Sequence, residues 1–130
     1  GNVVNTDILG SLEFACQVAG AKLVVVVGHS RCGAIKGACD GVELGNLTKL
    51  LGKISPAVEA VRDPVDAAAR TSGNAEFVEA VSHENVRQAV NAISERSDVL
   101  MKLQASGAIN IVGAMYDVSD GSVAFLDDPS

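Results

Sequence analysis

Residues 22–33 read Lys-Leu-Val-Val-Val-Val-Gly-His-Ser-Arg-Cys-Gly and decide the fold. The β-branched run from Leu23 to Val27 has no polar alternation, which is typical of a parallel strand covered by helices on both faces. Small residues and helix formers follow from Cys32 to Cys39, and Asp40-Gly41 is a stop signal. The stretch therefore predicts a strand, a tight turn and a helix that starts at once.

The remaining chain shows four more helical segments. The first is capped by Asn5 or Thr6 and ends at Gly20, and a pattern over 47–61 is interrupted by Pro56. A turn-rich connection over 62–74 precedes a strongly amphipathic helix over 75–96. Ser97 is predicted to cap a short helix that closes at Gly107.

Two further strands are expected near the C-terminus, over 109–118 and 122–126, joined by a hairpin at Ser119-Asp120-Gly121. The element order predicts one α/β domain over residues 1–130, with three layers (α, β, α) around a mostly parallel sheet. Three strands are few for so many helices, so we expect the sheet to be incomplete.

Composition excludes several classes of function. The 130 residues carry a formal charge of −6, and the basic residues are scattered, which argues against binding a nucleic-acid backbone. No apolar run approaches the ~20 residues that cross a bilayer, and no export signal is visible. The three cysteines form no CxxC pair, which indicates a reducing compartment, and we expect a cytoplasmic protein with no membrane partner.

The candidate site is the turn after the buried strand, because ligands of α/β sheets bind at the carboxyl ends of strands. His29 and Cys32 are three residues apart there, and Cys32 is expected in the first turn of the next helix, where the helix dipole favours a thiolate. This pair suits zinc. Two alternatives stay open: a turn histidine with a buried cysteine, or a nucleophilic Cys32. A Cys-based phosphatase is set aside, because Ala38 stands where its arginine is expected.

Other noticeable residues favour structural roles. Cys16 and Cys39 fall on apolar helix faces and are expected in the core. We expect His83 to face solvent without a role and Tyr116 to be a packed ring whose hydroxyl is satisfied at the sheet edge. For Arg31, a surface position and an ion pair across an interface are equally open.

Several motifs together resemble the β-class carbonic anhydrases. Gly28-His-Ser-Arg-Cys-Gly-Ala34 is very similar to their second zinc-ligand motif. Further similarities occur in the same order along the chain: Gly1-Asn2, Ser11-Leu-Glu-Phe14, Asn85-Val-Arg-Gln88, Ser97-Asp-Val-Leu100 and Gly113-Ala-Met-Tyr-Asp-Val118. The resemblance covers nearly the whole chain and identifies it with the C-terminal part of this family.

The resemblance implies a zinc-dependent lyase (carbonate dehydratase) that hydrates CO2 reversibly to bicarbonate and a proton through zinc-bound hydroxide. His29 and Cys32 would be two of its three protein ligands, and Asn2 and Gly33 are substrate-pocket candidates. It also implies a homodimer or a larger homo-oligomer.

The family's CxDxR motif, with the remaining cysteine ligand and an Asp-Arg pair, has no match here, so no catalytic residue is identifiable in this chain. We therefore expect 1–130 to be inactive alone and to need a companion N-terminal fragment that brings the missing first strands. The alternative is a non-catalytic binding or assembly module.

Overall fold

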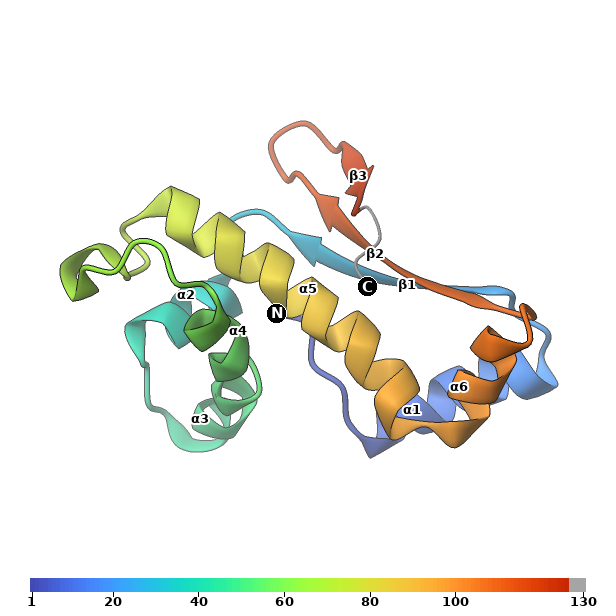
Figure 1. Ribbon diagram of the computed structural model, residues 1–130. Helices are drawn as coiled ribbons and strands as arrows, with labels where there is room; N and C mark the ends of the chain where they lie inside the picture. The colour runs from blue at the N-terminus through green and yellow to red at the C-terminus, as the bar shows by residue number, and fades with distance from the viewer. Residues whose placement is uncertain (127–130) are drawn as a thin grey trace.

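The structure, a computed structural model, describes residues 1–126 (Figure 1). The last four residues of the expected domain lie outside this range. Within it, no helix is both long and apolar enough to span a bilayer. The helical elements are α1 (Thr6–Glu13), a π-helical turn η1 (Phe14–Val18), α2 (Gly33–Asp40), α3 (Gly45–Gly52), α4 (Ser55–Ala60), a 3-10 turn η2 (Ala67–Ala69), α5 (Ala75–Arg96) and α6 (Asp98–Ala105). The strands are β1 (Leu23–His29), β2 (Asn110–Tyr116) and β3 (Val123–Phe125).

Helix boundaries follow the predicted signals. The side chain of Asn5 accepts a hydrogen bond from the Ile8 amide at 2.9 Å and begins α1, while Ser97 caps α6. Pro56 lies in the first turn of α4, so the helical pattern over 47–61 is divided into α3 and α4. These predictions are confirmed.

The sheet has the order β1-β2-β3. β1 and β2 run parallel, in a register from Leu23 opposite Asn110 to His29 opposite Tyr116. β3 pairs antiparallel with the end of β2 through the predicted hairpin. The expected α/β class with an incomplete, mixed sheet is confirmed.

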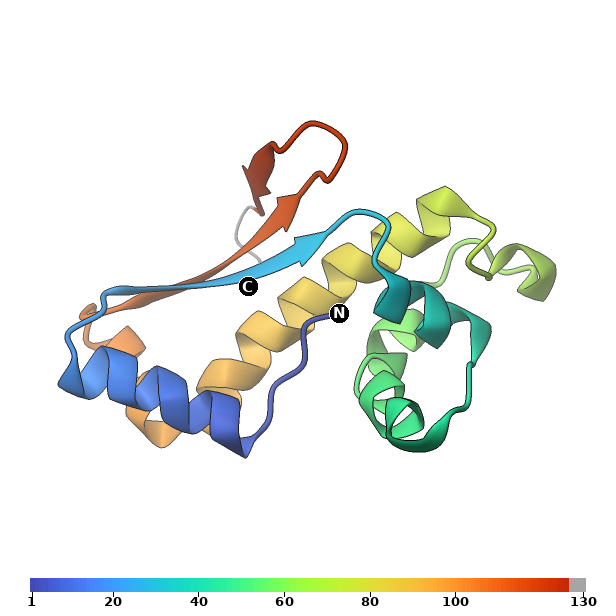
Figure 2. The same cartoon turned by 180° about the vertical axis from the view of Figure 1, so that it is seen from behind.

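Helices α1, α5 and α6 pack beneath one face of this sheet (Figures 1 and 2). Val24 and Ile111, which are register partners, are buried in the cluster that those helices form. The expectation that β1 is covered on both faces is wrong for the described residues. Leu23 is 53% exposed and Val27 is 44% exposed, because alternate side chains of a strand point to the face that these helices leave open.

A second core cluster joins α2, α3 and α4 to the N-terminal half of α5. Its buried members include Cys32, Ile54 and Phe77. The C-terminal half of α5 contributes Ala89 and Ile93 to the first cluster, so this one helix supports both the sheet and the smaller helical group (Figure 2).

Two glycines let α5 approach the sheet closely. A Cβ atom on Gly28 would lie 2.6 Å from Val86 Cγ2, and one on Gly113 would lie 2.6 Å from Val86 Cγ1. Separations this short are forbidden, so a larger residue at either position would push the helix away from the sheet. The end of β1 is thereby held against α5.

Candidate metal centre

The turn between β1 and α2 carries both predicted ligands. His29 is the last residue of β1, and Cys32 is the N-cap residue of α2, one position before the first turn in which it was expected. The turn thus lies at the carboxyl end of the parallel pair, where ligands of such sheets bind.

His29 has one ring nitrogen engaged and one available. Its Nδ1 lies 2.8 Å from the Ser30 carbonyl oxygen, which can only accept, so Nδ1 carries the proton. That tautomer leaves the lone pair of Nε2 free for a metal ion. The side chain is half-buried and lies on the sheet face opposite α5.

Cys32 is only 3% exposed and belongs to the second core cluster. Burial opposes ionisation of the Cys32 thiol, while the amides of Ile35 and Ala34 and a hydrogen bond from the Gly1 nitrogen, 2.8 Å from Sγ, favour it. The amides at the start of α2 thus help to stabilise the thiolate, the form of cysteine that ligates metals.

The two side chains fit zinc in type but not in number. Imidazole nitrogen and thiolate sulfur are both common zinc ligands, and catalytic sites use three protein ligands. Among residues 1–126, no group of three His, Cys, Asp or Glu side chains is placed to hold a metal ion. A complete site would need a donor from outside the described residues.

The substrate-pocket candidates lie on either side of this turn. Asn2 Nδ2 donates to the Val27 carbonyl oxygen at 2.9 Å, so its amide holds the end of β1. The Asn2 carbonyl in turn accepts from Asn85 Nδ2 at 2.8 Å. Gly33 is exposed at the start of α2, where an added Cβ would meet no atom within 4 Å.

Ser30 has a positioning role that the sequence analysis missed. Its amide donates to the Tyr116 carbonyl at 3.0 Å, and its Oγ accepts from the Val118 amide at 3.0 Å. The turn is thus tied to the end of β2. The signal was available, because parallel strands that end in register bring the residues after them together.

The remaining singled-out residues differ in outcome. Cys16 is buried as expected, whereas Cys39 is only half-buried. His83 is half-buried and lies 3.2 Å from Glu79, so the expectation of a solvent-facing side chain is only partly met. Tyr116 is 39% exposed, and its hydroxyl has no hydrogen-bond partner in the described part of the chain, so its predicted packing is wrong. The open sheet face leaves its ring uncovered.

The structure is thus an α/β domain with a His-x-x-Cys pair at the carboxyl end of its parallel strands. The family model for carbonic anhydrase matches residues 1–123. This chain belongs to the β-carbonic anhydrase family, as the resemblance predicted.

Similar proteins support this assignment. Carbonic anhydrase 2 of Mycobacterium tuberculosis is 32% identical over 127 residues, which are 98% of this chain and 59% of that protein. A carbonic anhydrase of Mycolicibacterium smegmatis is 32% identical over 95% of this chain and 58% of its own length. The chain thus spans about three fifths of these relatives.

Solved structures agree in fold. The β-carbonic anhydrase CafA of Aspergillus fumigatus has a TM-score of 0.78 at 29% identity, over 98% of this chain and 61% of its own. A Coccomyxa β-carbonic anhydrase has a TM-score of 0.79 at 20% identity, over 98% of this chain and 58% of its own, which shows the fold alone.

Proposed function

We propose that this chain is the zinc-bearing C-terminal portion of a carbonic anhydrase that hydrates CO2 reversibly to bicarbonate. The observation that carries the proposal is the free Nε2 of His29 in the same turn between β1 and α2 as the buried Cys32, in a chain of this family. A third protein ligand and the catalytic acidic and basic groups would come from a segment outside residues 1–130.

In this proposal each local residue has a defined task. His29 and Cys32 would hold zinc, and the chemistry that zinc would supply is the activation of water as a nucleophile at neutral pH. Ser30 fixes the turn against β2, and Asn2 fixes the end of β1, so that the His29 ring keeps its orientation. Preorganised ligands of this kind determine metal affinity.

The assembly and location belong to the same proposal. A solved neighbour, 22% identical in sequence, is one of two β-carbonic anhydrases from Sordaria macrospora that are described as tetrameric. We propose a homodimer or a larger homo-oligomer in the cytoplasm, with a companion N-terminal segment completing each site. The open face of the sheet, on which Leu23 and Val27 are exposed, supports a further covering element.

In the test, the N-terminal segment of carbonic anhydrase 2 of M. tuberculosis, a relative of which this chain covers 59%, is fused in front of this chain. We expect stoichiometric zinc by elemental analysis and CO2 hydration above buffer in a stopped-flow assay. His29→Ala and Cys32→Ala should each lose the zinc, while Cys39→Ser, a thiol outside the turn, should retain it.

The failures are separable. Stoichiometric zinc without hydration would refute the catalytic assignment, whereas zinc retained by His29→Ala would refute the ligand assignment. A folded fusion without zinc would favour the second candidate, a non-catalytic binding or assembly module. The observation behind that candidate is the pair of donors, too few for a zinc site within the described residues.

A further inference from the structure

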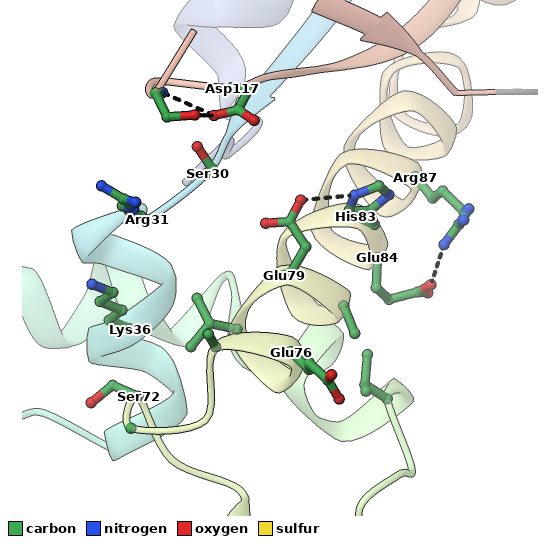
Figure 3. A pocket seen from close by; sticks show the side chains of 16 residues that line it. Ser30, Arg31, Lys36, Ser72, Glu76, Glu79, His83, Glu84, Arg87 and Asp117 are labelled. Atoms are coloured by element: carbon green, nitrogen blue, oxygen red, sulfur yellow. Dashed lines mark hydrogen bonds and ion pairs between the residues drawn. The ribbon is translucent and has the colours of Figure 1, made fainter.

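A polar groove lies between α2, the N-terminal half of α5 and the loop after β2 (Figure 3). Its volume is about 990 Å³, at the upper end of the range for ligand pockets, and it is open to solvent. Neither His29 nor Cys32 lines it. The proposed hydration of CO2 does not need this groove, since CO2 is far smaller than the groove's volume.

The two walls of the groove differ in charge. Arg31 and Lys36 stand on the α2 side, while Glu76 and Glu79 stand on α5 across the gap (Figure 3). The hydroxyls of Ser30 and Ser72, and the carboxylate of Asp117, complete the rim. On α5 the groove is also lined by Arg87, which pairs with Glu84, so the carboxylates of Glu76 and Glu79 leave that wall with a net negative charge opposite Arg31 and Lys36.

The protein does not neutralise these walls against each other. Within residues 1–126 the two ion pairs are His83 with Glu79 at 3.2 Å and Arg87 with Glu84 at 3.4 Å, and both lie within α5. Neither Arg31 nor Lys36 takes part in an ion pair of the described chain. Lys36 is thus available to a ligand, and Arg31, whose charge helps to lower the pKa of Asp117 on the rim, forms no direct ion pair.

The backbone at Arg31 is unusual. Its φ of 58° lies in the left-handed region, which a residue with a long side chain rarely adopts and which costs free energy. The hydrogen bonds of Ser30 to Tyr116 and Val118 hold the neighbouring turn in place. The exposed Arg31 side chain is consequently held at the rim of the groove.

We propose that this groove binds a short extended segment of a partner protein that carries one acidic and one basic side chain. The acidic side chain lies against Arg31 and Lys36, and the basic one lies against Glu76 and Glu79. The Ser72 hydroxyl donates to Asp40, so its oxygen can still accept a hydrogen bond from a backbone amide of the segment. Nucleic acid and inorganic phosphate fit poorly, because the carboxylates of the opposite wall repel them.

The experiment is an NMR titration that follows the protein's backbone amides as the peptide acetyl-Glu-Gly-Gly-Lys-amide is added. The two glycines are flexible, so the distance between the Glu and Lys side chains can adjust to the width of the groove. We expect saturable shifts at groove residues. Replacing the peptide's Glu by Gln, or its Lys by norleucine, should each weaken binding about two- to fivefold, as for exposed ion pairs.

A double-mutant cycle identifies the contacts. In Lys36→Gln, the Glu-to-Gln change in the peptide should have a smaller effect than in the wild-type protein, while the norleucine change should keep its full effect. Glu79→Gln should show the reverse pattern. Lys102→Gln and Glu59→Gln, exposed residues on other helices, should bind like the wild type.

The proposal fails if the titration gives no saturable shift at the groove, or if the uncharged Gln and norleucine peptide binds equally well. It also fails if the Glu-to-Gln change and the norleucine change in the peptide each weaken binding to Lys36→Gln and Glu79→Gln as much as they weaken binding to the wild-type protein. Arg31→Gln, a change at an exposed side chain, replaces Lys36→Gln if that variant does not fold.

Discussion

Arg70 is predicted to hold the loop before α5 in place, and its removal should destabilise the protein strongly. Its Nη1 donates to the carbonyls of Val61 at 2.7 Å and Pro64 at 3.0 Å, and its Nη2 donates to that of Val58 at 2.8 Å. The guanidinium carbon also lies 4.7 Å from the centroid of the Phe77 ring. One side chain thus connects the end of α4, the following loop and the buried face of α5.

The size of the effect follows from these contacts. Arg70 is half-buried, so each lost bond costs about 1 kcal/mol, near the middle of the usual range. The contact with Phe77 contributes about 0.5–1 kcal/mol. Arg70→Ala should therefore lower the free energy of unfolding by about 3–4 kcal/mol. Arg70→Lys should recover less than half of this loss, because an ammonium cannot reproduce the planar fork.

The assay is urea unfolding followed by circular dichroism at neutral pH. The matched control is Arg62→Ala, an exposed arginine of the same loop, which should change stability by less than about 0.5 kcal/mol. If Arg70→Ala stays within that same margin, the three carbonyl contacts do not stabilise the native state and the argument is refuted. A loss of the same size in Arg70→Lys and Arg70→Ala would support it, whereas full recovery by lysine would contradict the role of the fork.

Two further changes test the packing and the loop. Gly113→Ala should cost about 1–3 kcal/mol, because its Cβ would lie 2.6 Å from Val86 Cγ1, and adding Val86→Ala should recover part of the loss in thermal unfolding. An additive double mutant would contradict this contact. Hydrogen bonds from the Ser72 hydroxyl and amide lower the pKa of Asp40. The stability they confer is present above the carboxyl's unfolded pKa and disappears as pH falls through its folded pKa. Ser72→Ala should thus lower the urea midpoint at neutral pH but not in strong acid, and an equal deficit at both pH values would contradict it.

Local signals predicted the elements well. The stripe of apolar residues over 75–96 and the capping side chains of Asn5 and Ser97 placed α1, α5 and α6 correctly, since these signals act within a few residues. The β-branched run also gave the correct strand. The exposure of this strand was predicted wrongly. An apolar composition indicates that a strand can be covered on both faces, but it does not indicate which segments of the chain cover it.

The position of the candidate site in the chain was predicted from the sequence, but the hydrogen bonds that hold its residues in place were not. Sequence placed His29 and Cys32 in one turn, because three residues link them. The bond between Ser30 and Val118 depends on strand register, and the engagement of His29 Nδ1 depends on the local turn geometry. The groove is made from segments that no local pattern relates, so its opposed charges become visible only in three dimensions.

The register of β1 against β2 has a consequence for how the chain folds. Leu23 pairs with Asn110, so the pairing of β1 with β2 cannot form until the helices between them have been synthesised. Closing so long a loop is entropically costly, and parallel pairing of this kind slows folding. Within residues 1–126, β1 has no other strand partner during that interval, while α5 can already form through local contacts. We expect helix α5 to form early and the pairing of β1 with β2 to form late.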